Sequence, residues 1–327
     1  MTATVQPERI LKELRNLWID LGKEQEHGVL RACAMTFIVA TADQGDDQEL
    51  GEMIASLMHE HPSRAIVLRI RPTGELDARV FAQCWMPFGK RQQICCEQVE
   101  ITSPESQLGE AASVITGIAV PDLPVVLYLR TAALITNPAL EPVLPLASKL
   151  IVDSSRVADA ASGLQYLDRL RSKTPGCADL SWARLTPWRE AVSQLFDHQE
   201  ARNALDSIDE IRVVHAGDRI PSAAYYLAGW FLHVLRREPR TQIVAGTGEA
   251  HSGIVSVIVR APGGFEATVQ SLDCCQIETH VGNVSQRLVF PAESEGGALH
   301  EELGILGADP VYREVLRKVV QLCGRKL

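Results

Sequence analysis

The sequence predicts a two-domain α/β protein. Its N-terminal domain is expected to hold a mixed, partly parallel sheet covered by helices, and its C-terminal α+β domain an antiparallel meander. Three observations lead to this fold class. The 327 residues exceed the usual size of one domain. Short apolar runs at 123–130 and 149–152 are typical of strands inside a sheet that is covered on both faces. Strand-like segments joined by Gly-containing turns follow one another between 251 and 290.

The first elements alternate between helix and strand. Pro7 precedes apolar residues at helical spacing, which predicts a helix to about Gly22. A strand, a helix and a second strand are expected next, at 31–41, 49–60 and 64–71. Two further strands, 79–86 and 91–102, flank the turn Pro87-Phe88-Gly89 and predict an antiparallel pair. The sheet is therefore expected to be mixed.

The rest of the first domain leads to a composition change. A helix at 105–116 precedes the apolar strand 123–130, and a second apolar strand at 149–152 ends in Asp153, Ser154 and Ser155. We expect a helix to begin at these residues and to end near Arg171. The stretch 171–187 then mixes Pro, Gly and polar residues, which predicts the boundary between domains 1–173 and 174–327.

The second half reads as α+β. The predicted elements are a helix from Pro187, a strand at 211–215, a helix at 221–236, and strands near 251–260, 265–272, 276–281 and 286–290. The closing helix has marked ends, with Asp309 as its cap, Pro310 at its first position and Gly324 past its end.

Composition excludes several classes of function. The 41 acidic and 32 basic residues give a net charge of −9, which opposes general binding to nucleic acid. The longest apolar run, Ala223 to Leu235, has 13 residues, whereas a membrane helix needs about 20. The N-terminus lacks the pattern of a secretory signal, so we expect a cytoplasmic protein whose eight cysteines are mostly thiols. Arginine supplies 25 of the 32 basic residues, which favours fixed contacts with anions or proteins.

Known catalytic patterns are missing from the sequence. The segment 246–251 begins like a dinucleotide loop, but His251 replaces the third glycine and a strand pattern follows, so an ordinary turn is expected. His59-Glu60-His61 lacks the spacing that places two histidine ligands on one helical face. We also find no Walker loop and no nucleophile elbow. No catalytic residue, metal or cofactor is expected.

Two pairs of adjacent cysteines, Cys95-Cys96 and Cys274-Cys275, are candidates for redox chemistry. Neighbours on a strand point to opposite faces, which disfavours a relaxed disulfide or a shared zinc ion. The simpler interpretation is that each pair consists of small, partly buried apolar residues.

Polar residues gather at the predicted ends of the central strands, where α/β proteins often bind ligands. Arg130 follows the strand 123–130, and Asp153 and Ser154 follow the strand 149–152. A serine hydroxyl at a helix N-terminus there would suit a phosphate. The alternative is structural, with a serine capping the helix and Asp153 paired with Arg130.

The segment from Asp179 to Arg189 holds two tryptophans and two arginines. Residues of these types carry much of the energy of protein interfaces. A partner-binding surface is one interpretation, and contact between the protein's own domains is the other.

Six blocks in the first 190 residues resemble the glucose-6-phosphate dehydrogenase assembly protein family, known from cyanobacteria and actinobacteria. They are RACAMTFIVA at 31–40, HPSR at 61–64, CWMPFGKRQQICCEQ at 84–98, DLPVVLYLR at 122–130, VDSS at 152–155 and DLSWARLTPWRE at 179–190. The resemblance implies a non-catalytic partner that binds glucose-6-phosphate dehydrogenase, promotes its active oligomer and raises its activity in the oxidative pentose phosphate pathway. It also implies redox control through cysteines and thioredoxin, for which Cys274, Cys275 and Cys323 are the candidates.

On this basis we expect activation by differential binding, in which the protein prefers the active conformation of the dehydrogenase. The expected interface anchors are Trp182, Arg184, Trp188 and Arg189, and the expected polar cluster behind them is Arg64, Arg91, Arg130 and Asp153. A second hypothesis is a sugar-phosphate sensor or degenerate enzyme that uses Arg130 and Ser154. A third is a scaffold that kept the fold and changed its partner.

Overall fold

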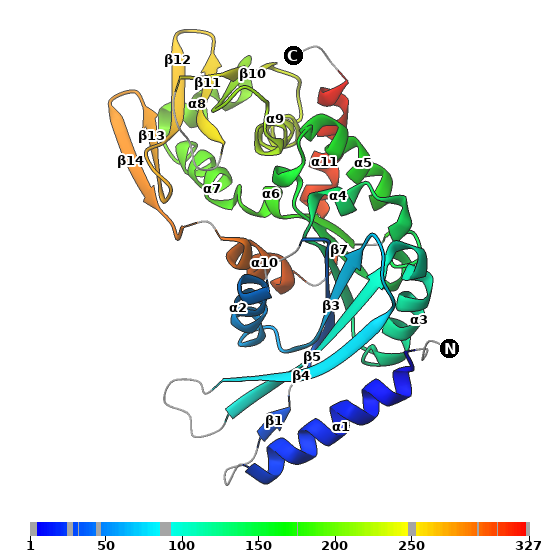
Figure 1. Cartoon of the computed structure of the whole chain (residues 1–327). Coiled ribbons are helices and arrows are strands. Elements are labelled where there is room, and N and C mark those ends of the chain that lie inside the picture. The colour runs from blue at the N-terminus through cyan, green and yellow to red at the C-terminus, as the bar shows by residue number, and fades with distance from the viewer. Residues whose placement is uncertain are drawn as a thin grey trace. The chain divides into compact units, whose positions relative to one another are not determined.

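The computed structural model describes residues 5–24, 29–31, 33–43, 47–85, 93–174, 176–247, 253–292, 294–305 and 307–324. The chain forms two compact units (Figure 1). The first comprises Met1–Val152, Arg171–Cys177 and Leu299–Ala308, and the second Asp153–Leu170, Ala178–Ala298 and Asp309–Leu327. Each unit thus draws on several chain segments. The domain boundary at 173/174 stays a prediction.

The first unit is built on the larger sheet, whose strand order is β1-β5-β3-β2-β6-β7-β8, with β4 paired to β5. Strands β2, β3, β5, β6 and β7 run parallel, and β4 runs antiparallel to β5. This confirms the mixed, partly parallel sheet. Its strands are β1 (Val29–Arg31), β2 (Met35–Thr41), β3 (Ser63–Arg71), β4 (Asp77–Trp85), β5 (Gln93–Pro104), β6 (Val125–Leu129), β7 (Lys149–Val152) and β8 (Gly176–Asp179).

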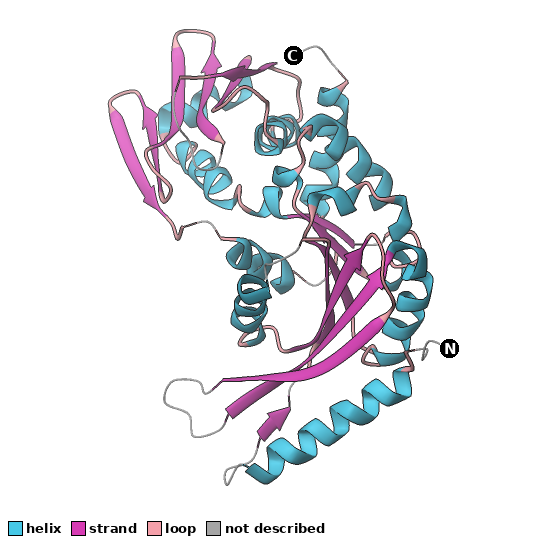
Figure 2. Ribbon diagram, in the orientation of Figure 1, coloured by secondary structure: helices cyan, strands magenta, loops and turns pink. Residues whose placement is uncertain are grey.

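Helices cover both faces of this sheet, which explains why its central strands are apolar throughout. Every residue of β2 is buried, although successive side chains point to opposite faces. The chain moves outward from β2 through β3 to β5 and then crosses back to β6, so the helices in the two directions lie on opposite faces. Figure 2 shows the helices on either side of the strands. They include α1 (Pro7–Glu24), α2 (Asp47–Met58) and α3 (Leu108–Ile118).

Short helical turns connect the later strands of the first unit. The 3-10 turn η1 (Glu105–Gln107) leads into α3, and α4 (Ala132–Ile135), η2 (Pro138–Leu140) and η3 (Leu144–Leu146) lie between β6 and β7. After β7 the predicted helix start is wrong. Ser154 begins only a 3-10 turn, η4 (Ser154–Arg156), and the helix α5 (Ala160–Arg171) begins six residues later.

The second unit holds a six-stranded sheet of order β10-β9-β11-β12-β13-β14. Its four last strands form the predicted antiparallel meander, whereas β10 pairs in parallel with β9. The strands are β9 (Glu210–His215), β10 (Arg240–Ala245), β11 (Ile254–Ala261), β12 (Phe265–Ser271), β13 (Gln276–Val281) and β14 (Val284–Val289). Buried and partly exposed residues alternate along β9 and β13, so one face of the sheet is covered and the other is more open.

Helices α7 (Thr186–Leu195), α8 (Gln199–Ala204) and α9 (Ser222–Val234) pack on the covered face of this sheet. The turn η5 (Leu205–Ser207) follows α8. Helices α6 (Leu180–Ala183) and α11 (Pro310–Cys323) pack on α9, and α10 (Glu295–Gly304) has residues in both units. Helix α9 is buried from Ser222 to Leu232 and packs on α11. A Cβ on Gly229 would lie 2.6 Å from Val319 Cγ2, so glycine allows this close approach.

Several boundaries differ from the sequence predictions. The strand expected at 31–41 is divided into β1 and β2, and both β8 and β10 were missed. The predicted turn Pro87-Phe88-Gly89 lies outside the described residues. The closing helix is confirmed, with Asp309 accepting hydrogen bonds from the Val311 and Tyr312 amides and Gly324 at its end. Within the described ranges, no helix has the length and apolar character needed to cross a membrane.

Candidate functional site

An arginine–carboxylate pair stands where the sequence places a polar strand end. Asp153 follows β7 and is 1% exposed. Arg184 Nη1 lies 2.9 Å from Asp153 Oδ1, and Arg184 Nη2 lies 2.9 Å from Oδ2. Arg156 Nε is a further 3.3 Å partner of Oδ2. The carboxylate therefore occupies the planar fork that a phosphate would use on Arg184.

The protonation of Asp153 reflects these partners. Burial alone would raise the pKa of Asp153, but hydrogen bonds from Arg184 and Ser155, with the charges of Arg184 and Arg156, lower it below its ordinary value. The Ser155 hydroxyl donates to Asp153 Oδ1 at 2.5 Å, and its amide lies 3.2 Å from the same oxygen. Asp153 thus caps the turn η4 as an ionised group.

A second aspartate, Asp179, ends β8 and is fully buried. Its Oδ1 accepts hydrogen bonds from the amides of Ser154 at 3.0 Å and Ser181 at 2.9 Å, and its Oδ2 accepts one from the Tyr226 hydroxyl at 2.7 Å. Burial raises the pKa of Asp179, and the hydrogen bonds from Ser154 and Tyr226 oppose that rise. Sequence reasoning missed this residue, although it ends a strand immediately before a short helix.

The hydroxyl of Tyr226 extends this buried network. It lies 3.3 Å from the Tyr312 hydroxyl, and burial together with the Asp179 charge holds the pKa of Tyr226 well above its ordinary value. Both rings lie about 6 Å from the Trp182 ring, as measured between centroids. A polar chain therefore runs from the strand end into an aromatic cluster.

The two expected tryptophan anchors are buried inside the second unit. Trp182 and Trp188 are each 2% exposed, and the Trp182 indole donates to Asp309 Oδ2 at 3.0 Å. Arg189 lies over the Trp182 ring, 3.8 Å from its centroid, and donates to the Trp182 carbonyl at 2.7 Å. Packing within the chain is therefore the interpretation that burial favours for both indoles. Arg184 and Arg189 are only partly buried.

Two further members of the predicted polar cluster, Arg64 and Arg130, have partners of their own. Arg64 is 5% exposed and donates to Glu97 Oε2 at 2.5 Å and to the Ile118 carbonyl. Arg130 is 4% exposed and pairs with Glu49 at 3.2 Å. Arg91 lies outside the described residues. The Ser154 hydroxyl is buried and finds no hydrogen-bond partner among the residues that the structure describes. It does not open onto the surface, because Ser154 is 1% exposed.

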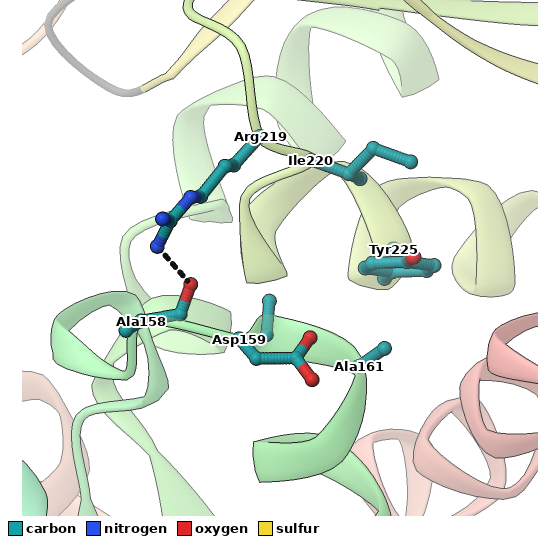
Figure 3. A pocket seen from close by; sticks show the side chains of 7 residues that line it. Ala158, Asp159, Ala161, Arg219, Ile220 and Tyr225 are labelled. Carbon is teal, nitrogen blue, oxygen red and sulfur yellow. Dashed lines mark hydrogen bonds between the residues drawn. The ribbon is translucent and has the colours of Figure 1, made fainter.

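A hollow of about 460 Å³ lies in the second unit beside the start of α5 (Figure 3). Arg219 donates to the Ala158 carbonyl at 3.2 Å across it, and Tyr225 forms part of its wall. The Ser162 hydroxyl donates to Asp159 at 2.5 Å, and this bond lowers the pKa of Asp159. The Asp159 carboxylate and the Arg219 guanidinium give the hollow both a negative and a positive charge. Such a lining is a poor match for a doubly charged phosphate.

The cysteines are placed differently from the sequence expectation. Cys274 and Cys275 lie in the turn between β12 and β13, so the premise that they are strand neighbours is wrong. Their Sγ atoms lie 2.9 Å apart, and Asp273 Oδ1 accepts the Cys275 amide hydrogen bond at 2.8 Å. The contact with Cys274, followed by burial, raises the pKa of Cys275 to about 11. Cys323 ends α11, where burial and the Asp159 charge raise its pKa to about 11. The side chains of Cys95 and Cys96 lie outside the described residues.

Comparison with protein families gives two consecutive matches. Residues 54–169 match the N-terminal domain of the glucose-6-phosphate dehydrogenase subunit family, and residues 175–316 match the C-terminal domain of the same family. Together these matches take in most of the chain.

Curated relatives agree with these matches. The chain is 31% identical over 204 residues to the "Putative OxPP cycle protein OpcA" of Synechocystis, an alignment that covers 61% of this chain and 42% of the relative. A protein of the same name from Nostoc punctiforme is 28% identical, over 55% of this chain and 39% of the relative. The chain thus matches about two fifths of the length of these relatives.

The solved structures that overlay on this chain include two oxidoreductases. The 3-ketoreductase KijD10 of Actinomadura kijaniata overlays with a TM-score of 0.49 at 9% identity, over 88% of this chain and 95% of that chain. A Gfo/Idh/MocA family oxidoreductase of Vibrio cholerae gives a TM-score of 0.40 at 9% identity, over 88% and 97%. Structural similarity at this level gives no information about the activity of this chain. By the paired domain matches and the curated relatives, this chain belongs to the OpcA-like glucose-6-phosphate dehydrogenase assembly family.

Proposed function

We propose that this protein is a non-catalytic assembly factor and activator of glucose-6-phosphate dehydrogenase in the oxidative pentose phosphate pathway. The observation that carries the proposal is the pair of family matches, which follow one another along the chain at 54–169 and 175–316. The named relatives are putative OxPP cycle proteins, which supports a role in the same pathway.

Activation in this proposal follows from differential affinity. A protein that binds the active oligomer of the dehydrogenase more tightly than its other states shifts the population toward that oligomer. A tenfold preference is worth about 1.4 kcal/mol at 25 °C. Such a mechanism needs a complementary surface and uses no chemical group of this chain as an acid, base or nucleophile.

The contacts around Arg184 and Arg189 support a modified version of the predicted anchor. Both arginines are partly exposed, whereas the tryptophans beside them are buried. Arg189 is fixed by contacts with the Trp182 ring, the Trp182 carbonyl and, at 2.8 Å, the Thr186 hydroxyl. A guanidinium held in one orientation loses little entropy when a partner carboxylate binds it. In the proposal, the arginines contact the dehydrogenase and the tryptophans position them.

The direct test is to mix the purified chain with the dehydrogenase of the same organism. We expect the two proteins to co-purify, and we expect the activity of the dehydrogenase to rise on addition of the chain. Dehydrogenase that neither binds the chain nor changes activity, across pH and salt conditions in which both proteins are folded, would overturn the proposal.

The surface assignment has its own variant. Arg189→Ala removes the positioned guanidinium and should weaken binding of the dehydrogenase by about thirtyfold, which corresponds to the roughly 2 kcal/mol of an interface hot spot. Arg202→Ala, on α8, is the matched control, because Arg202 is an exposed arginine whose guanidinium donates to two main-chain carbonyls, each at 3.3 Å. Equal binding by the two variants would remove Arg189 from the interface and leave the assembly function standing.

A further inference from the structure

The strand β14 forms one end of the six-stranded sheet and pairs only with β13 among the described strands (Figure 1). Residues 284–287 are all exposed, and the exposed fractions of Val284 and Val289 are 48% and 68%. Apolar side chains at this level of exposure show that no described segment covers the strand.

Proteins keep edge strands from pairing with other chains by means of proline, charged side chains, a bulge or a very short strand. β14 has one of these features, the charge of Arg287, and that guanidinium lies 3.2 Å from Glu278 of its own chain. β14 reads VSQRLV over six residues, and its register against β13 is regular from Val281↔Val284 to Gln276↔Val289. The outer edge of β14 therefore presents a regular row of backbone amide and carbonyl groups that can hydrogen-bond to another strand.

The pairing with β13 determines which backbone groups face outward. The amide of Phe290, immediately after β14, donates to the Cys275 carbonyl at 2.9 Å. Hydrogen-bonding direction alternates along an antiparallel strand, so the even-numbered residues of β14 direct their amide and carbonyl groups toward β13. The outward groups are then those of Ser285, Arg287 and Val289.

A second copy of β14 can use these groups in two extended registers. A two-fold axis perpendicular to the sheet keeps the covered faces of both copies on the same side of the joined sheet. Each residue must therefore lie opposite a residue whose side chain points to the same face of the sheet. The register centred on Arg287 places Arg287 opposite the same residue of the second copy, which like charges disfavour.

The register centred on Gln286 is self-complementary. Val284 then lies opposite Leu288 of the second copy, Ser285 opposite Arg287, and Gln286 opposite Gln286, where two amides can hydrogen-bond. Arg287 already has a carboxylate neighbour, Glu278, at 3.2 Å on its own chain. We propose that two copies of this chain associate by antiparallel pairing of β14 with β14, centred on Gln286, to form one continuous sheet.

Such a dimer carries two copies of any dehydrogenase-binding surface, which raises the avidity for an oligomeric enzyme. The inference does not depend on the proposed function. Self-association is measured on the chain alone, and activation is measured with the enzyme, so either result can fail without the other.

Sedimentation velocity of the 327-residue chain tests the pairing. We expect a concentration-dependent species of twice the 35.8 kDa mass of one chain. Ser285→Pro removes an outward amide and leaves the backbone hydrogen bonds to β13 intact, with loss of only the 3.4 Å bond from the Ser285 hydroxyl to Glu278. This variant should stay monomeric and melt close to the temperature of the wild type at dilutions where the wild type is monomeric. A chain that is monomeric at all accessible concentrations would overturn the proposal. If the chain is monomeric and β14 instead pairs with a strand of the dehydrogenase, the edge is a binding site for the enzyme. That result would also overturn pairing between two copies of this chain.

A charge swap at the centre of the pair tests the register. Gln286→Lys and Gln286→Glu each place like charges opposite one another and should lower the dimer fraction severalfold, whereas an equimolar mixture of the two should restore it. Gln321→Lys makes the same substitution at an exposed position of α11 and should behave as the wild type. A dimer that both Gln286 variants leave unchanged would contradict the β14 pairing.

Discussion

Arg184 holds Asp153 through both carboxylate oxygens, with Nη1 2.9 Å from Oδ1 and Nη2 2.9 Å from Oδ2. Asp153 is almost wholly buried, whereas the side chain of Arg184 keeps 17% of its exposure. The pair joins the turn that follows β7 to the segment that carries both buried tryptophans. It therefore links two sequence blocks, VDSS and DLSWARLTPWRE, that are separated along the chain.

Arg184→Ala should destabilise the second unit by about 3 kcal/mol, because it leaves a buried carboxylate with a poorer set of partners. Denaturant unfolding followed by circular dichroism measures the change. Arg317→Ala, which breaks an exposed pair with Glu314, should cost less than about 1 kcal/mol and is the matched control. Equal losses of unfolding free energy in the two variants would show that the buried pair of Arg184 with Asp153 stabilises the fold no more than an exposed ion pair does.

Acid should weaken the fold through Asp153. The folded pKa of this carboxyl is lowered, so its stabilising contribution is present above the unfolded pKa of about 4 and is lost as pH falls through the folded pKa. Asp153→Asn should therefore flatten the acid side of a plot of unfolding free energy against pH. A variant that keeps the wild-type slope below pH 4 would contradict this assignment.

Asp179 should have the opposite effect on the pH dependence of stability, lowering the free energy of unfolding as the pH rises. Its folded pKa is raised by burial, so ionisation costs stability as pH rises from the unfolded pKa toward the folded one. Asn can still accept from the Ser154 and Ser181 amides without carrying a charge. The free energy of unfolding of Asp179→Asn, relative to the wild type, should thus increase as the pH rises above about 4, the unfolded pKa. A difference that is constant with pH would show that Asp179 does not titrate in this range.

The end of the chain shows what local sequence signals predict well. Asp309, Pro310 and Gly324 mark the limits of α11 through short-range hydrogen bonding and backbone geometry, and the structure agrees at both ends. The sequence also predicts β7 with its observed limits, because a short, mostly apolar run is typical of a central strand. All four residues of β7 are buried in the structure.

Long-range pairing explains what was missed. β10 contains polar and apolar residues without clear alternation, and it is a strand because it pairs in parallel with β9, about 30 positions earlier. The four residues of β8 stand in a segment whose Pro and Gly favoured a boundary. Tryptophan and arginine are common both in cores and at interfaces, so composition could not show that Trp182 and Trp188 are buried.

The adjacent cysteines give a redox prediction. Oxidation by a disulfide reagent should join Cys274 to Cys275, with loss of two hydrogens and reduction of the reagent, because the two sulfur atoms already lie 2.9 Å apart. Reduced thioredoxin should reverse the change. Mass spectrometry of tryptic peptides detects the bond, and the rate should rise with pH because the pKa of Cys275 is raised to about 11. Cys274→Ser is the control, and an unreactive wild type would remove this pair from redox control.

In the proposed function, this chain activates the dehydrogenase by favouring its active oligomer. The measurement that tests it most directly is a titration of the chain into the dehydrogenase, with the oligomer distribution and the enzymatic activity recorded on the same samples. We expect the larger oligomer and the activity to rise together and to saturate at the same concentration of chain. Activity that rises while the oligomer distribution stays constant would contradict it.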